Sequence, residues 1–215
     1  INKMPGDYEA KFANLRTFYG YMMAHPGKKL LFMGQEFGQF IEWDEKKQLD
    51  WMLLDYDKDT ELQNYVKTLN AFYKEHPAFW QIDYSWEGFQ WICADDNQGN
   101  CAAFVRRDKK GGCLLVCCNF SPVHRRGYRL GLPFPGRYEC VLNTDRPEFG
   151  GTGLGDTAPV KSEYVPCHGQ EQSMEIDLPP MSAVIYRCVK KFPPRRTRAA
   201  GPAQKKSAGS APATP

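Results

Sequence analysis

The spacing of apolar residues changes near Trp80, and this change limits what each half of the chain can fold into. Before Trp80 the apolar residues recur every three or four positions, as on one face of a helix. After Trp80 they form short β-rich runs separated by turn residues. These runs lie at about 84–92, 101–107, 113–119, 126–132, 137–143, 172–178 and 182–189. The pattern predicts a helical segment followed by an antiparallel all-β domain.

Two amphipathic helices are expected within the first 80 residues. The first starts after Asp7, whose carboxylate can cap backbone N–H groups, and must stop before Pro26. The second is expected to start near Thr60, with Gln63 placed for a capping box, and to end before Pro77. The apolar stripe of the first helix is Phe12, Leu15, Phe18, Tyr19, Met22 and Met23.

A short apolar run, Leu30 to Met33, stands between the two expected helices and stops at Gly34. Continuous apolar runs of this kind are typical of parallel strands that are covered on both faces. The segment that follows, residues 34–54, is polar and rich in aromatic residues. Loops at the carboxyl ends of such strands bind ligands, so we predict a buried strand over 30–33 and the rim of a site after it.

The amino-acid sequence of this segment resembles that of a known family. The phrase FMGQEFGQ over residues 32–39, followed by Glu42-Trp43 and Leu49-Asp50-Trp51, is similar to the 1,4-alpha-glucan branching enzymes of the alpha-amylase superfamily, glycoside hydrolase family 13. The similarity extends to residues 3–7, 11–16, 115–122 and 141–145, and so covers nearly all of residues 1–189.

The resemblance implies an architecture of α/β plus all-β type. Residues 1–80 would supply the last strand and two flanking helices of a catalytic (β/α)8 barrel. Residues 81–190 would form the carboxyl-terminal antiparallel β-sandwich domain, and residues 191–215 a disordered basic tail. Since a complete barrel needs about 250 residues, we expect the chain to be the carboxyl-terminal part of a longer protein.

The resemblance also implies a reaction and the absence of its catalytic residues. The whole enzyme would cut an α-1,4-glucan and transfer the chain to a 6-hydroxyl, making the α-1,6 branches of glycogen. The family's three catalytic carboxylates sit on barrel strands upstream of Lys3, so we expect no catalytic residue here and no activity from this chain alone. The local acids Glu36, Glu42, Asp44, Glu45 and Asp50 lie on one segment, whereas barrel enzymes draw catalytic groups from several strand ends.

We expect the loop to bind substrate instead. Phe37, Trp43 and Trp51 offer flat apolar faces for sugar rings, and Glu36 and Gln39 can form hydrogen bonds with hydroxyl groups. The alternative, in which Phe37 and Trp51 fill a core and fix the loop, stays open. The expected partners are an α-glucan such as glycogen or amylose, and the amino-terminal part of the barrel.

The eight cysteines indicate packing in a reducing, cytoplasmic compartment. They are Cys93, Cys101, Cys113, Cys117, Cys118, Cys140, Cys167 and Cys188, and no two have the CxxC spacing of zinc or redox motifs. No cofactor or metal is implied, because the family chemistry uses carboxylates.

The charge distribution argues against nucleic acid or a membrane as partner. The formal charge is +3, but seven basic residues and no acid lie between Lys190 and the chain end, which leaves −4 for residues 1–189. No apolar run approaches the ~18 residues needed to span a bilayer.

Two other functions remain open from the sequence. One is another alpha-amylase superfamily enzyme, such as a trehalose-releasing hydrolase or a debranching enzyme. The other is a non-catalytic glucan-binding or structural module built on residues 81–189, although the sequence shows no clear exposed aromatic platform there.

Overall fold

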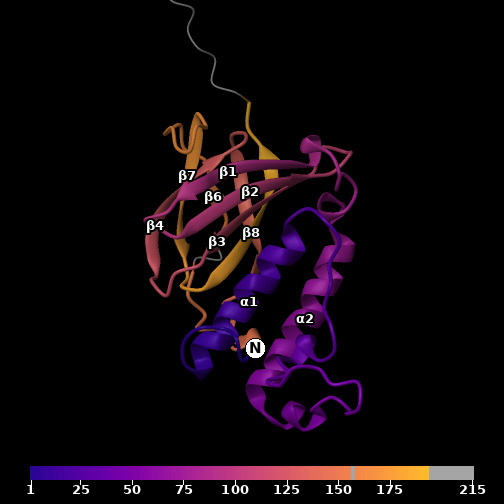
Figure 1. Ribbon diagram of the computed structural model, residues 1–215. Coiled ribbons are helices and arrows are strands. Elements are labelled where there is room, and N and C mark those ends of the chain that lie inside the picture. Colours follow the sequence, from indigo (N-terminus) through magenta and orange to yellow (C-terminus); the bar gives the residue numbers. More distant parts are fainter. Residues whose placement is uncertain (156–157, 194–215) are drawn as a thin grey trace, which may run out of the picture.

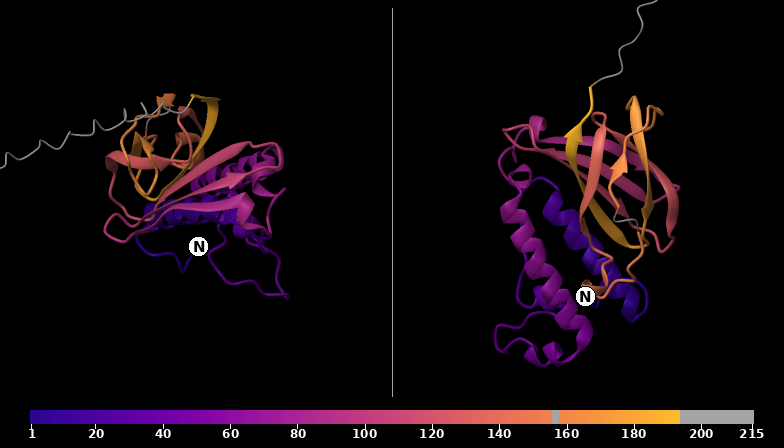
Figure 2. Two further views of the ribbon diagram at one scale, coloured as in Figure 1. Left: turned by 90° about the horizontal axis from the view of Figure 1, so that it is seen from above. Right: turned by 180° about the vertical axis from the view of Figure 1, so that it is seen from behind.

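A computed structural model describes residues 1–155 and 158–193. Helices α1 (Tyr8–Ala24) and α2 (Asp57–Glu75) lie side by side and cover one face of a six-stranded sheet, and a two-stranded sheet covers the other face (Figures 1 and 2). Lys191, the first residue of the predicted disordered tail, belongs to the last strand, and from residue 194 onward the tail lies outside the described residues.

The β domain agrees closely with the predicted strands. Its strands are β1 (Phe89–Asp96), β2 (Cys101–Arg107), β3 (Cys113–Asn119), β4 (Arg125–Leu132), β5 (Gly136–Asn143), β6 (Val160–Lys161), β7 (Gln172–Leu178) and β8 (Ser182–Lys191). The six-stranded sheet has the order β1-β2-β3-β8-β5-β6, the second sheet pairs β4 with β7, and every pairing is antiparallel. The predicted antiparallel β-sandwich is therefore confirmed. The first strand runs over Phe89–Asp96 rather than 84–92, because residues 86–88 form a 3-10 turn, η4, and the short strand β6 was not predicted.

The two helices are present, and one of their predicted starts is wrong. The Asp7 carboxylate accepts a hydrogen bond from the Ala10 N–H at 2.9 Å, and α1 ends at Ala24, as predicted. Helix α2 starts at Asp57 instead of Thr60, with no side-chain cap, so the predicted capping box does not form. The exposed acidic side chain of Asp57 in the first turn favours this earlier start through the helix dipole.

The predicted strand over residues 30–33 does not form. The backbone there is irregular, and the side chains of Leu30, Phe32 and Met33 are 73%, 44% and 38% exposed. A strand is stable only when its N–H and C=O groups pair with a neighbour. No described segment lies beside residues 30–33 as a strand, so the sheet part of the expected barrel is not seen in this structure.

Two hydrophobic cores lie on the two faces of the six-stranded sheet. The first is formed by α1 and α2 packing on residues such as Phe104, Val116 and Ile185, and the second lies between the two sheets around Leu115 and Leu130. Neighbouring residues of β3 alternate between the cores, and every residue of β3 is buried. The helical segment and the β domain thus share a core.

The cysteines pack as predicted. None of the eight is in a disulfide bond in the described part of the chain, and Cys93, Cys101, Cys113, Cys117 and Cys118 are buried. Four of these five lie on strands β1 to β3 and point into the inter-sheet core, whereas Cys118 packs in the core beneath the helices. Small apolar thiols thus fill space in both cores.

Candidate functional site

The loop after Gly34 is closed by two glycines. Gly34 and Gly38 have φ angles of 87° and 76°, in the left-handed region, and flank the 3-10 turn η1 (Gln35–Phe37). A Cβ atom on Gly34 would lie 2.9 Å from the side-chain oxygen of Gln39. The spacing of the two glycines therefore folds the loop back on itself directly after the apolar run.

Gln39 holds the loop together from within. Its side chain is 8% exposed, and its amide oxygen accepts a hydrogen bond from the Asp50 N–H at 3.0 Å. Its own backbone N–H donates to the carbonyl of Gly34 at 3.0 Å, and its amide nitrogen donates to the carbonyl of Ile41 at 3.4 Å. The contact between Gln39 and a ligand stays a prediction. In the structure the Gln39 side chain joins two parts of the loop through its hydrogen bonds with Asp50 and Ile41.

Phe37 and Trp51 form a tilted aromatic pair in which only Trp51 is accessible. The Phe37 side chain is fully buried, and its ring centroid lies 5.4 Å from that of Trp51 at an interplanar angle of 38°. Trp51 opens the 3-10 helix η2 (Trp51–Asp55) and is 51% exposed. Phe37 is thus a core residue, as in the alternative left open above, whereas Trp51 is half exposed and does not fill a core.

Trp43 and Gln39 border a hollow of about 660 Å³ between the loop and α1. The Trp43 side chain is 54% exposed and meets the Phe32 ring edge to face at 5.6 Å. The Lys3 ammonium lies 2.5 Å from the Glu42 carboxylate at the rim, and this contact lowers the pKa of Glu42. The walls combine apolar side chains such as Phe18, Met22 and Leu30 with polar groups in about equal measure.

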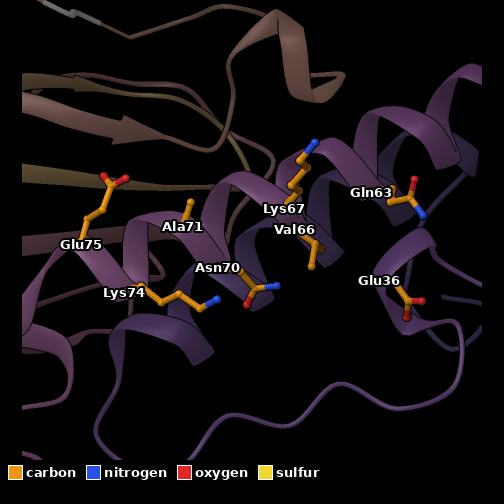
Figure 3. A pocket seen from close by; sticks show the side chains of 8 residues that line it. All are labelled: Glu36, Gln63, Val66, Lys67, Asn70, Ala71, Lys74 and Glu75. Atoms are coloured by element: carbon orange, nitrogen blue, oxygen red, sulfur yellow. The ribbon is translucent and has the colours of Figure 1, made fainter.

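Glu36 faces a different hollow. It lies across from the outer surface of α2, where Gln63, Lys67, Asn70 and Lys74 surround a space of about 550 Å³ (Figure 3). The five predicted site residues are therefore not brought together in one place. Glu36 lies on the α2 side, Gln39 and Trp43 border the α1 hollow, and Phe37 is buried beneath Trp51.

Tyr19 connects α1 to the loop. Its hydroxyl donates a hydrogen bond to the Gln35 carbonyl at 2.8 Å. Burial raises the pKa of Tyr19, and the charge of Glu36 adds to this rise. The phenol therefore remains a hydrogen-bond donor across the physiological pH range and fixes the η1 turn against the helix.

Sequence reasoning missed Arg106, a fully buried cation between α1 and the β domain. It donates to the carbonyls of Ala24, Phe79 and Gly88 at 2.7, 2.9 and 3.3 Å, and to the Asp83 carboxylate at 3.0 Å. A usable signal was present, because residues two apart on a strand share a face. Arg106 is two residues after Phe104, which packs in the core beneath the helices.

Within residues 1–155 and 158–193 no helix is both long enough and apolar enough to cross a membrane. In the same part of the chain, no group of three or more His, Cys, Asp or Glu side chains is arranged to hold a metal ion.

The β domain matches a known family model. Residues 91–189 match the alpha amylase C-terminal all-beta domain. Among solved structures, the crystal structure of Ttha1563 from Thermus thermophilus has a TM-score of 0.58 at 21% identity, covering 85% of this chain and 31% of that one. The catalytic module of the glycogen-degrading pneumococcal virulence factor SpuA has a TM-score of 0.57 at 17% identity, covering 87% and 33%. These two likenesses show the fold.

The closer similarities are to branching enzymes. The 1,4-alpha-glucan branching enzyme GlgB of Halothermothrix orenii is 47% identical over 188 residues, which is 87% of this chain and 30% of that enzyme. The GlgB of Aquifex aeolicus is 49% identical over 187 residues, 86% of this chain and 30% of the enzyme. The chain thus spans about a third of the length of these relatives. Residues 91–189 are thus similar to the alpha amylase C-terminal all-beta domain, and most of the chain is similar to about a third of the length of the 1,4-alpha-glucan branching enzymes.

Proposed function

We propose that the chain is part of a 1,4-alpha-glucan branching enzyme, which cleaves an α-1,4-glucan and transfers the released chain to a 6-hydroxyl. The observation that carries this proposal is the 47–49% identity to two GlgB enzymes over 86–87% of the chain. The solved neighbours include glycogen-degrading proteins, but identities of 16–17% bear on the fold alone.

The loop over residues 34–56 would contact the glucan. Trp43 and Trp51 each expose about half of their side chain and can stack against sugar rings. Glu36 supplies hydrogen-bond acceptors on the α2 side. Phe37 and Gln39 would act through the shape of the loop, since both are buried in it. Holding the acceptor chain in place makes its 6-hydroxyl a better competitor than water for the glycosyl group.

The catalytic carboxylates would come from outside this chain. Retaining transfer needs two carboxyl groups roughly 5 Å apart. The acids of the loop are instead engaged separately: Glu42 pairs with Lys3, and the Asp44 carboxylate accepts the Lys46 N–H at 2.9 Å. Glu36 faces the other hollow. We therefore expect the chain to be inactive alone.

The remainder of a barrel would cover the hollow between α1 and residues 30–43. Its exposed apolar side chains, Leu30, Phe32 and Met33, belong to the run that did not form a strand. A neighbouring parallel strand would pair with the backbone N–H and C=O groups of these residues and bury their side chains.

The cysteines favour a reducing, cytoplasmic compartment. None of the eight is in a disulfide bond in the described part of the chain.

A complementation assay tests the proposal. The purified chain is mixed with amylose, with and without the upstream part of the Aquifex aeolicus relative, and the fall of iodine-stained absorbance is followed. We expect activity only in the mixture, and a large loss from Trp51→Ala. Full activity from the chain alone would show that its own acids are catalytic. No activity in a mixture whose two parts demonstrably associate would contradict a branching function.

A further inference from the structure

A second group of aromatic side chains is exposed at the junction between α2 and the β domain. Tyr84 and Trp86 are 81% and 84% exposed, the highest values among the large hydrophobic residues of the described chain. Tyrosine and tryptophan are enriched at interaction sites, because each combines an apolar ring with a hydrogen-bonding group. We propose that Trp86 is the platform of a glucan-binding site on the β domain, separate from the loop over residues 34–56. The class of ligand rests on the proposed function.

The backbone holds Trp86 in a fixed position. It opens the 3-10 turn η4 (Trp86–Gly88), which the Ser85 side chain caps by accepting from the Glu87 N–H at 3.4 Å. Gly88 packs so closely that a Cβ atom would lie 1.9 Å from the Ile82 carbonyl oxygen. The carbonyl of Gly88 also accepts a hydrogen bond from the buried Arg106. The backbone of this turn is therefore ordered before a ligand binds, so that mainly the Trp86 side chain has freedom to lose.

A hollow beside Trp86 provides the polar groups that a sugar needs. It measures about 550 Å³ and is lined by Trp86, Glu87, Phe89, Gln90 and Arg107. The Arg107 guanidinium donates to the Gln90 side-chain oxygen at 2.5 Å, which orders both planar groups. An aromatic face beside several hydrogen-bonding groups is the arrangement that binds polyhydroxylated ligands.

The charge of this hollow favours a neutral ligand. Glu87 and Arg107 are the acidic and basic groups among its lining residues, and their formal charges cancel. Nucleic acids and anionic surfaces need clusters of basic residues, which this hollow lacks. A glucan chain carries no charge and offers both ring faces and hydroxyl groups, so it matches the lining.

The site lies near the opposite end of α2 from Trp51, which opens η2. Trp86 follows the carboxyl end of α2, whereas η2 precedes its amino end (Figure 1). The 19 residues of α2 span about 28 Å at a rise of about 1.5 Å per residue. One long glucan chain, or two branches of one glycogen particle, could occupy both places. Binding at two linked sites raises the overall affinity for a polymer above that for a short oligosaccharide.

An NMR titration of the full chain with maltoheptaose tests the proposal. The chain has five tryptophans, and the Trp86 indole N–H signal is assigned by its absence in Trp86→Phe. We expect this signal to shift in a saturable way, and Trp86→Ala to weaken glycogen binding in affinity electrophoresis by roughly tenfold. Trp86→Phe keeps an aromatic face and should retain most of the binding.

Trp80→Ala is the matched control. Trp80 is 42% exposed in the same segment but does not line the hollow, so its removal should leave glycogen binding unchanged. An unmoved Trp86 signal at saturating maltoheptaose overturns the proposal, as does an equal loss from Trp80→Ala and Trp86→Ala. A shifted Trp86 signal with failed complementation would refute the branching function and leave the binding site standing. Complementation without the shift would refute the site alone.

Discussion

The guanidinium group of Arg106 lies 3.0 Å from the Asp83 carboxylate, and both side chains are almost completely buried. Arg106 also donates to backbone carbonyls at the end of α1 and in the two short turns that follow α2. Asp83 accepts a further hydrogen bond from the Gly27 N–H at 3.2 Å. The pair therefore ties three separate segments to strand β2.

Replacement of this buried cation should be strongly destabilising. Arg106→Leu leaves the Asp83 charge unpaired and three carbonyls without their donor, and we expect a loss of about 3–5 kcal/mol. Arg107→Leu, on the partly exposed neighbour, should cost less than about 1 kcal/mol. Urea unfolding at pH 7 measures both. Equal losses would mean that the buried network contributes little.

Gly27 and Gly34, on either side of the apolar run, both have a left-handed backbone, but only Gly34 is closely surrounded. Replacing each by alanine therefore distinguishes the cost of backbone strain from the cost of crowding. Gly34 and Gly27 have φ angles of 87° and 110°, but a Cβ atom would meet Gln39 at 2.9 Å only in the first case, with nothing within 4 Å in the second. Gly27→Ala should cost about 1–2 kcal/mol from the backbone alone. Gly34→Ala should cost more, and should speed hydrogen exchange at the Asp50 N–H, because Gln39 has to move. Equal costs and unchanged exchange would contradict this account.

Asp59 should make stability depend on pH. The Asp59 carboxylate is buried, and burial raises its pKa from 3.8 to about 6, although contacts with its own backbone and with the Tyr8 hydroxyl oppose the rise. Between these values the folded state binds more protons than the unfolded state, so the free energy of unfolding falls as pH rises through this range. Above about pH 6 the folded state carries the full cost of burying the charged Asp59 carboxylate. Below about pH 4 this cost is absent, because the carboxyl group is protonated in both states.

Asp59→Asn removes this penalty. We expect the variant to be more stable than the parent by about 1–3 kcal/mol at pH 7 and equally stable near pH 3.5. The exposed Asp57 lies in the same helical turn, and Asp57→Asn is the control, with little effect expected. Denaturant unfolding of the parent and both variants at pH 7 and pH 3.5 measures these differences in the free energy of unfolding. A destabilised Asp59→Asn at pH 7 would mean that the charged form is favoured.

The shared core predicts a single unfolding transition. Leu15→Ala on α1 and Leu115→Ala in the inter-sheet core should each cost about 2–5 kcal/mol. Because both cores contact strand β3, each variant should shift the far-UV circular dichroism and the tryptophan fluorescence transitions together. A Leu15→Ala variant that unfolds its helices first, with the fluorescence transition unmoved, would show two independent units.

The sequence predicted local features well. Strands β2, β3 and β7 have the predicted bounds, because turn residues such as Gly99 and Gly112 end each run on both sides. The Asp7 cap was predictable for the same reason, since a cap depends on residues only three positions apart. The packing of Cys113 and Cys117 followed from their place inside apolar runs.

Features that depend on distant partners were not predictable. The run over 30–33 has the composition of a strand, but strand formation depends on a neighbour that composition does not reveal. Arg106 was missed because its acceptors are backbone carbonyls from three segments. The site residues were placed on one loop, yet the left-handed turns at Gly34 and Gly38 direct Glu36 and Trp43 to different hollows.

The packing of α1 and α2 on the six-stranded sheet has a consequence for protein engineering. The junction near Trp80 is a natural place to join sequences from two relatives, but α1 and α2 rest directly on Phe104, Val116 and Ile185. A chimera joined there would combine one parent's helices with another parent's sheet face. Exchanging residues 1–191 as one block keeps both sides of that interface from the same parent, and grafts of the β domain alone need matched substitutions at these three positions.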